Sequence, residues 1–194
     1  METIEKGLVV AGLEALRQIG GDALVQVLLG QAGKLEFTRT DILGDHVPIE
    51  DYLHYRDTAL DFLQESFSMT AFQTGQIVVR NIHKEKESQI RKLIERFEYA
   101  QNKLPVIGQA AVLASKENPG VVRATMRSES LLAITIENCP ECRGLQKQSP
   151  FCYLNQGVIS EFAERFLGLQ VNTRETKCMA TGDPACEIEV SIFR

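Results

Sequence analysis

Several residue types and patterns are scarce or missing in this chain of 194 residues. It has no tryptophan, three histidines and six prolines, and its apolar runs are all short. A membrane-spanning helix needs about 20 apolar residues in a row, so we expect no transmembrane segment. The acidic residues Glu2 and Glu5 also make the start unlike a secretory signal. We therefore expect a cytoplasmic protein that is at most peripheral to a membrane.

Positive charge is also in short supply. Lysine and arginine total 21 against 26 acidic residues, which leaves a net charge of −5, and the basic residues are dispersed. A nucleic-acid-binding protein normally carries a basic patch, so we exclude nucleic acid as a partner. The patterns G-x-S-x-G, G-x-x-x-x-G-K-[ST] and H-E-x-x-H are missing too. Binding is therefore expected rather than catalysis.

The first two thirds of the chain has apolar residues at helical spacing. The pattern predicts helices over 8–19, 22–29, 48–67, 69–81, 84–103 and 106–115, with Gly20-Gly21 separating the first two. The buried face of the third is predicted to carry Tyr52, Tyr55, Ala59 and Phe62. We treat residues 1–194 as one domain, in which the helix within 1–20 is an extension or a dimer element.

After Asn118-Pro119-Gly120 the apolar residues alternate with a period of two. This pattern predicts strands over 121–127, 131–138, 169–178 and 186–193, with one helix over 149–168 between the second and third strands. The fold class is therefore α+β. We expect N-terminal helices packed on a four-stranded antiparallel sheet, in the order α-rich, β-β-α-β-β.

All five cysteines lie in the last third of the chain. In a reducing compartment, metal ligation is more plausible for them than a disulfide framework. The spacing C-x22-E-x2-C-x7-C selects Cys152, Glu175, Cys178 and Cys186 as a closed, structural zinc site. Residues three apart on a regular strand point to opposite faces, so Glu175 and Cys178 can share a metal only if the strand bulges between them.

Two other thiols leave alternatives open. Cys139 and Cys142 form a C-x2-C pair that could complete a four-cysteine zinc site with Cys178 and Cys186. The same pair could instead be a redox pair or an attachment site for a pigment. Cysteines are also common as small buried residues without any chemistry, so burial alone would explain their presence as well.

The C-terminal motifs resemble those of the 4-vinyl reductase domain family. Cys152 precedes an aromatic residue and Gly157, and E-T-K-C-x-A-T-G-D-x-x-C follows at 175–186; I-T-I-E-N-C at 134–139 is similar to the family's second strand. The resemblance covers about residues 20–194. It implies a relation in fold to small subunits of the vesicle-tethering TRAPP complexes and to sensor domains of aromatic-responsive activators. In those sensors three cysteines and a glutamate hold zinc, at positions that match Cys152, Glu175, Cys178 and Cys186.

The resemblance also implies a hydrophobic ligand between the helices and the sheet. We expect a tetrapyrrole, such as a bilin or a chlorophyll precursor, in contact with Phe151, Tyr153, His54 and Phe97. Arg80, Arg91 and Arg123 are candidates to pair its acid groups. The family's phenol sensors use a tryptophan that this chain lacks, so we do not expect phenol sensing.

The expected role is that of a carrier, sensor or assembly factor, acting as a homodimer with photosystem or pigment-pathway proteins. One alternative is a vinyl reductase of (bacterio)chlorophyll synthesis, for which the sequence has no recognisable cofactor motif. The other is a protein-interaction scaffold without a ligand.

Overall fold

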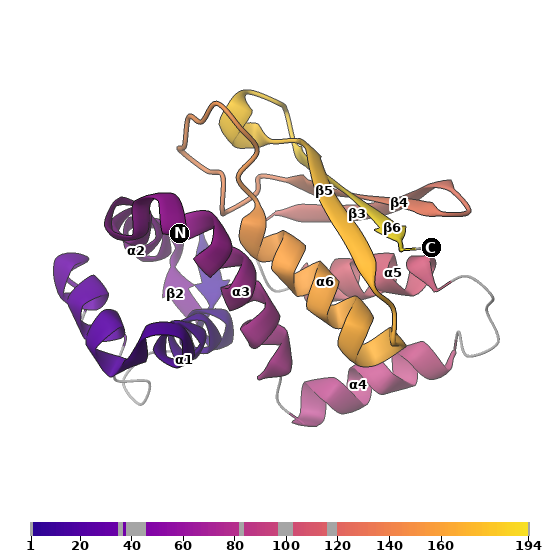
Figure 1. Ribbon diagram of the computed structural model, residues 1–194, viewed down its shortest axis with the longest axis horizontal. Coiled ribbons are helices and arrows are strands. Elements are labelled where there is room, and N and C mark those ends of the chain that lie inside the picture. The colour runs from indigo at the N-terminus through magenta and orange to yellow at the C-terminus, as the bar shows by residue number, and fades with distance from the viewer. Residues whose placement is uncertain are drawn as a thin grey trace.

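A computed structural model of the protein describes residues 2–34, 37, 46–81, 84–96, 103–115 and 120–193. Figure 1 shows a sheet with helices on one side and an N-terminal group of helices beside it. The α+β fold class and the order α-rich, β-β-α-β-β are confirmed. The single-domain assignment and the role of residues 1–20 as an extension or dimer element stay predictions.

The C-terminal half forms an antiparallel sheet of four strands in the order β3-β4-β6-β5. Its strands are β3 (Val121–Ser128), β4 (Leu131–Glu137), β5 (Val171–Lys177) and β6 (Cys186–Ile192). On the two central strands, Leu132 pairs with Val190 and Ile134 pairs with Ile188, and all four side chains are buried. The alternation that predicted the strands therefore reflects one face packed against the core.

Three helices accompany this sheet: α4 (Lys84–Glu95), α5 (Leu104–Ala114) and α6 (Tyr153–Leu167). Figure 1 shows α5 and α6 against the same side of the sheet. Helix α6 ends at Gly168, whose φ of 65° is the left-handed conformation that glycine adopts most easily. The helix predicted over 84–103 ends earlier, at Glu95, and Pro105 lies in the first turn of α5, where its missing N–H costs no helix bond.

The N-terminal half consists of β1 (Thr3–Glu5), α1 (Lys6–Gln31), β2 (His46–Pro48), α2 (Ile49–Leu63), the 3-10 turn η2 (Gln64–Ser66) and α3 (Phe67–Arg80). Helix α1 is kinked at Gly21, which has a φ of 74° and agrees with the predicted break. The pairing of β1 with β2 was not predicted, because each strand has only three residues. The prediction for Phe62 was wrong, since its side chain is 41% exposed near the end of α2.

Helices α3 and α6 join the two halves by a close contact of their backbones. A Cβ atom on Gly157 would lie 2.0 Å from the carbonyl oxygen of Phe72, and one on Gly75 would lie 2.2 Å from that of Leu154. Both distances are far inside van der Waals contact. Glycine at these two positions is therefore what allows the helices to approach so closely.

We expect Gly157→Ala to destabilise the protein by about 2–4 kcal/mol, because α3 and α6 must separate to admit the methyl group. The matched control is Gly30→Ala, at a helical glycine of α1 with no atom within 4 Å of its Cβ position. Alanine is the better helix former, so the control should be neutral or more stable by about 0.5–1 kcal/mol. Urea unfolding of both variants checks this, and equal stabilities would contradict the close packing.

Candidate functional site

Six side chains that can bind a metal meet where the sheet, helix α6 and the loop before it come together. Glu175 lies in β5, Cys178 just after it and Cys186 at the start of β6, while Cys152 is the N-cap residue of α6. The loop between β4 and α6 provides Cys139 and Cys142. All six side chains are buried. The structure thus brings the predicted set and the alternative thiols into one place.

A β-bulge puts Glu175 and Cys178 on the same side of the strand. The pairing of β5 with β6 shifts between Glu175, opposite Ile188, and Lys177, opposite Glu187. The extra residue reverses the alternation that would otherwise separate the two side chains. The condition that the sequence set for a shared site is met.

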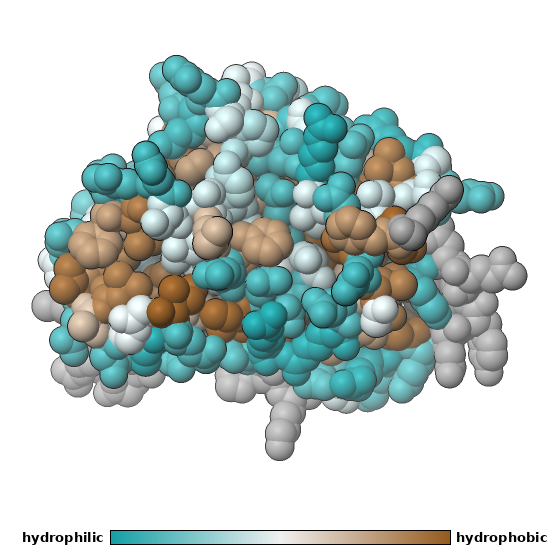
Figure 2. Space-filling model, viewed as in Figure 1, coloured by the Kyte–Doolittle hydropathy of each residue, from teal (hydrophilic) through white to brown (hydrophobic). Residues whose placement is uncertain are grey.

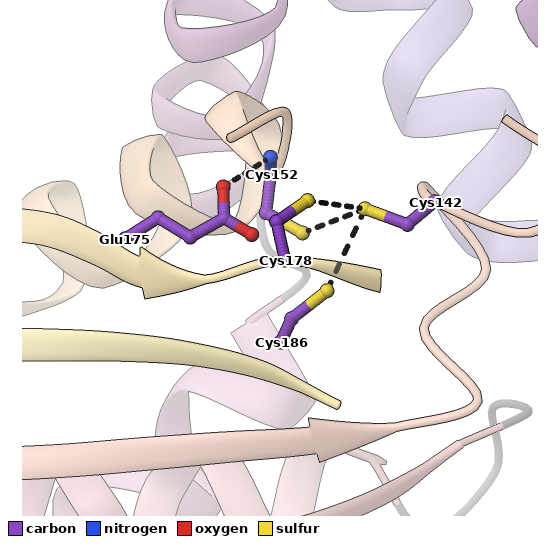
Figure 3. A group of neighbouring side chains, drawn as sticks. All are labelled: Cys142, Cys152, Glu175, Cys178 and Cys186. Carbon is purple, nitrogen blue, oxygen red and sulfur yellow. Dashed lines mark hydrogen bonds between the residues drawn. The ribbon is translucent and has the colours of Figure 1, made fainter. Parts of the chain in front are cut away.

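Cys142 lies nearest to the middle of the cluster, which Figure 3 shows in close-up. Its Sγ is 3.2 Å from the Sγ of Cys152, 3.4 Å from that of Cys178 and 3.5 Å from that of Cys186. One ligand atom from each of these four cysteines and from Glu175 lies within 4.8 Å of all the others. Cys139 is outside this group, although its Sγ is 3.5 Å from that of Cys152.

The surroundings of the cluster favour a bound cation. The Cys152 N–H donates to Oε2 of Glu175 over 2.8 Å, while the other carboxyl oxygen, Oε1, is buried without a hydrogen-bond partner. Burial raises the pKa of the Glu175 carboxyl to about 8. A hydrogen bond with the Cys152 thiol lowers the pKa of Cys178 to about 6. The Met179 N–H also points at the Cys186 sulfur, 3.4 Å away, and such a bond stabilises a thiolate.

This donor set fits zinc. Zinc–sulfur bonds of about 2.3 Å in a tetrahedron place the sulfurs about 3.8 Å apart, close to the separations around Cys142. Each thiol loses its proton when it binds, which removes the crowding of protons among the sulfurs. With four protein ligands the site would be closed, as in structural rather than catalytic zinc centres. The assignment of particular ligands stays a prediction.

A cavity of about 710 Å³, counting its open mouth, lies next to the cysteines. Helices α1, α2 and α3 form most of its wall, and Leu154 of α6, Phe151 and Glu141 complete it. The rings of Phe67 and Phe151 stack at 5.2 Å between centroids and 12° between planes. The wall is mainly apolar and aromatic, as is usual for a site that takes up a small hydrophobic molecule.

The predicted ligand contacts agree only in part with this cavity. Phe151 lines it, whereas Tyr153 and His54 do not, and His54 is exposed on α2. We therefore correct the expectation for Tyr153 and His54, because the helices that carry them turn these side chains away from the cavity. Phe97 lies outside the described residues. The sequence analysis missed Gly12, which also lines the cavity.

The candidate arginines are placed elsewhere as well. None of the three lines the cavity, and each forms an ion pair with a glutamate: Arg80 with Glu161, Arg91 with Glu87, and Arg123 with Glu137. The expectation that one of them binds the acid group of a ligand is therefore corrected.

The cation that does line the cavity is Arg56 of α2, which is 6% exposed. Its Nη1 donates to the carbonyl oxygens of Pro140 and Glu141, at 2.9 and 3.1 Å, within the C-x2-C loop. Its Nε and Nη2 donate to Asp57. One side chain thus joins the cavity to the loop that carries Cys142. A charged residue on the same helical face as Tyr52 and Ala59 was the signal in the sequence.

Residues 132–192, which contain every cysteine of the cluster, match the family model of the 4-vinyl reductase domain. This part of the chain is a 4-vinyl reductase domain. Two uncharacterised proteins of Methanocaldococcus jannaschii are similar to the chain. MJ0745 is 34% identical over 79 residues, covering 41% of this chain, and MJ0150 is 26% identical over 103 residues, covering 53%. The matched segments span 42% and 58% of these relatives, about half of their length.

Two kinds of solved structure share the fold. An H-NOX protein from S. oneidensis in the Fe(II)NO ligation state has a TM-score of 0.60 and 11% identity, and the match covers 100% of both chains. The phenol-responsive sensory domain of the transcription activator PoxR, with phenol, has a TM-score of 0.57 and 15% identity, and covers 75% of both chains. At such identities the likeness concerns the fold. Among the described residues, no helix has the length and apolar character needed to cross a membrane.

We expect Arg56→Met to loosen the cysteine loop of the 4-vinyl reductase domain. The carbonyl groups of Pro140 and Glu141 would lose their donor, which should destabilise the protein by about 2–3 kcal/mol. Asp57→Asn is the control, because Asp57 is half-exposed and its loss leaves the loop contacts intact, at a cost of about 0–1 kcal/mol. Amide exchange over residues 139–145 should accelerate only in Arg56→Met. Equal protection in both variants would contradict this role of Arg56.

Proposed function

We propose that this protein binds a hydrophobic small molecule in the cavity between α1, α2, α3 and the start of α6, and that a structural zinc ion stabilises the adjoining 4-vinyl reductase domain. The observation that carries the proposal is the cavity itself. It has a mainly apolar wall, a stacked pair of aromatic rings and a buried arginine. Its volume of about 710 Å³ falls in the range of about 300–1,000 Å³ that is common for ligand sites.

The comparisons support a sensor-like binding role. PoxR is described as a phenol-responsive sensory domain with phenol, and the H-NOX protein as an Fe(II)NO complex. Both are proteins whose fold accommodates a small molecule. We transfer the principle of a ligand held inside the fold, and not the identity of the ligand.

For the ligand we propose a tetrapyrrole that needs no histidine, such as a bilin or a chlorophyll precursor. Among the described residues that line the cavity there is no histidine, cysteine or methionine to ligate a haem iron. Tyrosine is the remaining type of haem ligand present, but burial raises the pKa of Tyr52 and Tyr55 and so disfavours their phenolate forms. The guanidinium of Arg56 uses four of its five N–H groups in the bonds described above, and the fifth is available to an acid group.

The zinc ion would be held by Cys152, Cys178 and Cys186, together with a fourth ligand from Glu175 or Cys142. It would tie the start of α6 to the hairpin of β5 and β6. We further propose a cytoplasmic homodimer that carries or senses pigment, or assists photosystem assembly.

The test is a titration of zinc-loaded protein with biliverdin, chlorophyllide and phenol, followed by absorption and calorimetry. We expect saturable binding of biliverdin or chlorophyllide at one molecule per chain, and little binding of phenol. If none of the three binds and protein isolated from its own cells has no pigment absorbance, the ligand proposal is wrong. Turnover of a divinyl tetrapyrrole with a nicotinamide cofactor would instead favour the reductase alternative.

An exposed apolar surface favours a second candidate function, that of an interaction scaffold. Figure 2 shows hydrophobic side chains gathered where α1, α2 and α3 lie. Large apolar side chains of this region are exposed: Ile19, Val27, Phe62 and Met69. Met69 is 69% exposed. Light scattering tests one form of this reading, because a homodimer formed through this surface should dissociate in Met69→Lys with ligand binding unchanged.

A further inference from the structure

From the arrangement of the sulfurs we infer that the fourth zinc ligand in this chain is Cys142, so that the ion is held by four thiolates: Cys142, Cys152, Cys178 and Cys186. This inference rests on the proposed zinc site and replaces the three-cysteine, one-glutamate set that the family resemblance implies. Glu175 then supports the site from outside the coordination sphere.

The distances single out Cys142. It is the one cysteine whose sulfur approaches the sulfurs of all three other ligands to 3.5 Å or less. Figure 3 shows the three dashed lines meeting at its sulfur, with Glu175 on the far side of Cys152. Four sulfurs within 4.8 Å of one another can close around one ion with small movements.

The loop that presents Cys142 is held in shape before any metal binds. The N–H groups of Cys142 and Arg143 both donate to the carbonyl oxygen of Cys139, at 3.2 and 3.1 Å. From the other side, Arg56 binds the carbonyl oxygens of Pro140 and Glu141. The turn therefore has little freedom left to lose when Cys142 binds a metal, which favours its participation.

The competing ligand is Glu175, and its buried, unpartnered Oε1 is the argument for it. Its Oε2, however, already accepts the N–H of Cys152, which is the usual task of a residue that orients a ligand from outside. Thiolate is also the softer donor, and structural zinc sites are built mainly from cysteine and histidine. Five donors compete for four positions, and geometry and donor type both favour the sulfur.

The direct test is the number of sulfur atoms around zinc, measured by X-ray absorption on the whole, zinc-loaded chain. We expect four sulfurs in the wild type and in Glu175→Gln, and three sulfurs with one oxygen or nitrogen in Cys142→Ser. In competition with a chelator, zinc affinity should fall at least about 100-fold in Cys142→Ser and about 10-fold in Glu175→Gln. Cys139→Ser is the matched control, since this buried thiol of the same loop is outside the proposed set, and its affinity should stay within about threefold of the wild type.

Three sulfurs and one oxygen in the wild type would overturn the inference, and so would an unchanged zinc affinity in Cys142→Ser. The wild-type spectrum decides the question even if Cys142→Ser does not fold. Failure of the proposed zinc site itself looks different, because the wild type would then bind well under one zinc ion per chain after reconstitution. Bound iron with four sulfurs would support the ligand set and contradict the choice of metal.

Discussion

Removal of zinc should lower the midpoint of thermal unfolding by about 10 °C or more. The proposed ligands come from the β4–α6 loop, the start of α6 and the β5–β6 hairpin, so the ion cross-links three segments that otherwise meet through buried thiols. Structural zinc contributes several kcal/mol to folding. For a chain of this length, 1 kcal/mol corresponds to about 2–4 °C, so a loss of about 4 kcal/mol shifts the midpoint by about 8–16 °C.

Cys178→Ser provides the internal control for this experiment. The variant should unfold at the lower temperature of the metal-free protein, and added chelator should lower its midpoint no further. Acidification should act like the chelator, because protons compete with zinc for the thiolates and the stability that zinc provides is lost as the pH falls. Scanning calorimetry at measured zinc content checks these results. Full removal of zinc with an unchanged midpoint would show that the ion does not stabilise the fold.

The second large effect concerns ligand affinity in Gly12→Leu. Gly12 lines the cavity, and no atom lies within 4 Å of the position that a Cβ would take. A leucine side chain can therefore enter the cavity without displacing the backbone. Leucine also favours the helix over glycine by up to about 1 kcal/mol. We expect at least a 100-fold loss of affinity for biliverdin or chlorophyllide, with stability equal to or above that of the wild type.

Gly30→Leu is the matched control for this substitution. Gly30 lies on the same helix and has equally open surroundings, but it does not line the cavity. The control should gain a similar amount of helix stability and bind the ligand as the wild type does. Calorimetric titration of the two variants separates blocked binding from damage to the fold. Equal affinities in both variants would place the ligand somewhere else.

The C-terminal half could be predicted well because its signals are local. Alternating residues in β4 and β6, the cap at Gly168 and the spacing of the cysteines are each visible within a few positions of the chain. Even the bulge after Glu175 could be anticipated, since the proposed ligand set required it. The place of Cys142 could not, because it depends on how the β4–α6 loop folds back toward the hairpin.

The cavity was beyond sequence reasoning for a similar physical reason. It arises where α1, α2 and α3 fail to fill the space between them, and such a gap depends on the angles between helices rather than on any motif. Phe62 was predicted to be buried by periodicity alone, but α2 ends one residue later and leaves its side chain exposed. His54 was singled out by its neighbours in sequence, yet it faces solvent. Arg56, two residues further on, is the buried one.

Native mass spectrometry of the protein isolated from its own cells tests the central claim most directly, with wild type and Gly12→Leu measured side by side. The wild type should retain one hydrophobic molecule and one zinc ion per chain. Gly12→Leu should retain the zinc ion alone. A wild-type protein that carries no small molecule, or a Gly12→Leu variant that retains the same mass, would contradict ligand binding in this cavity.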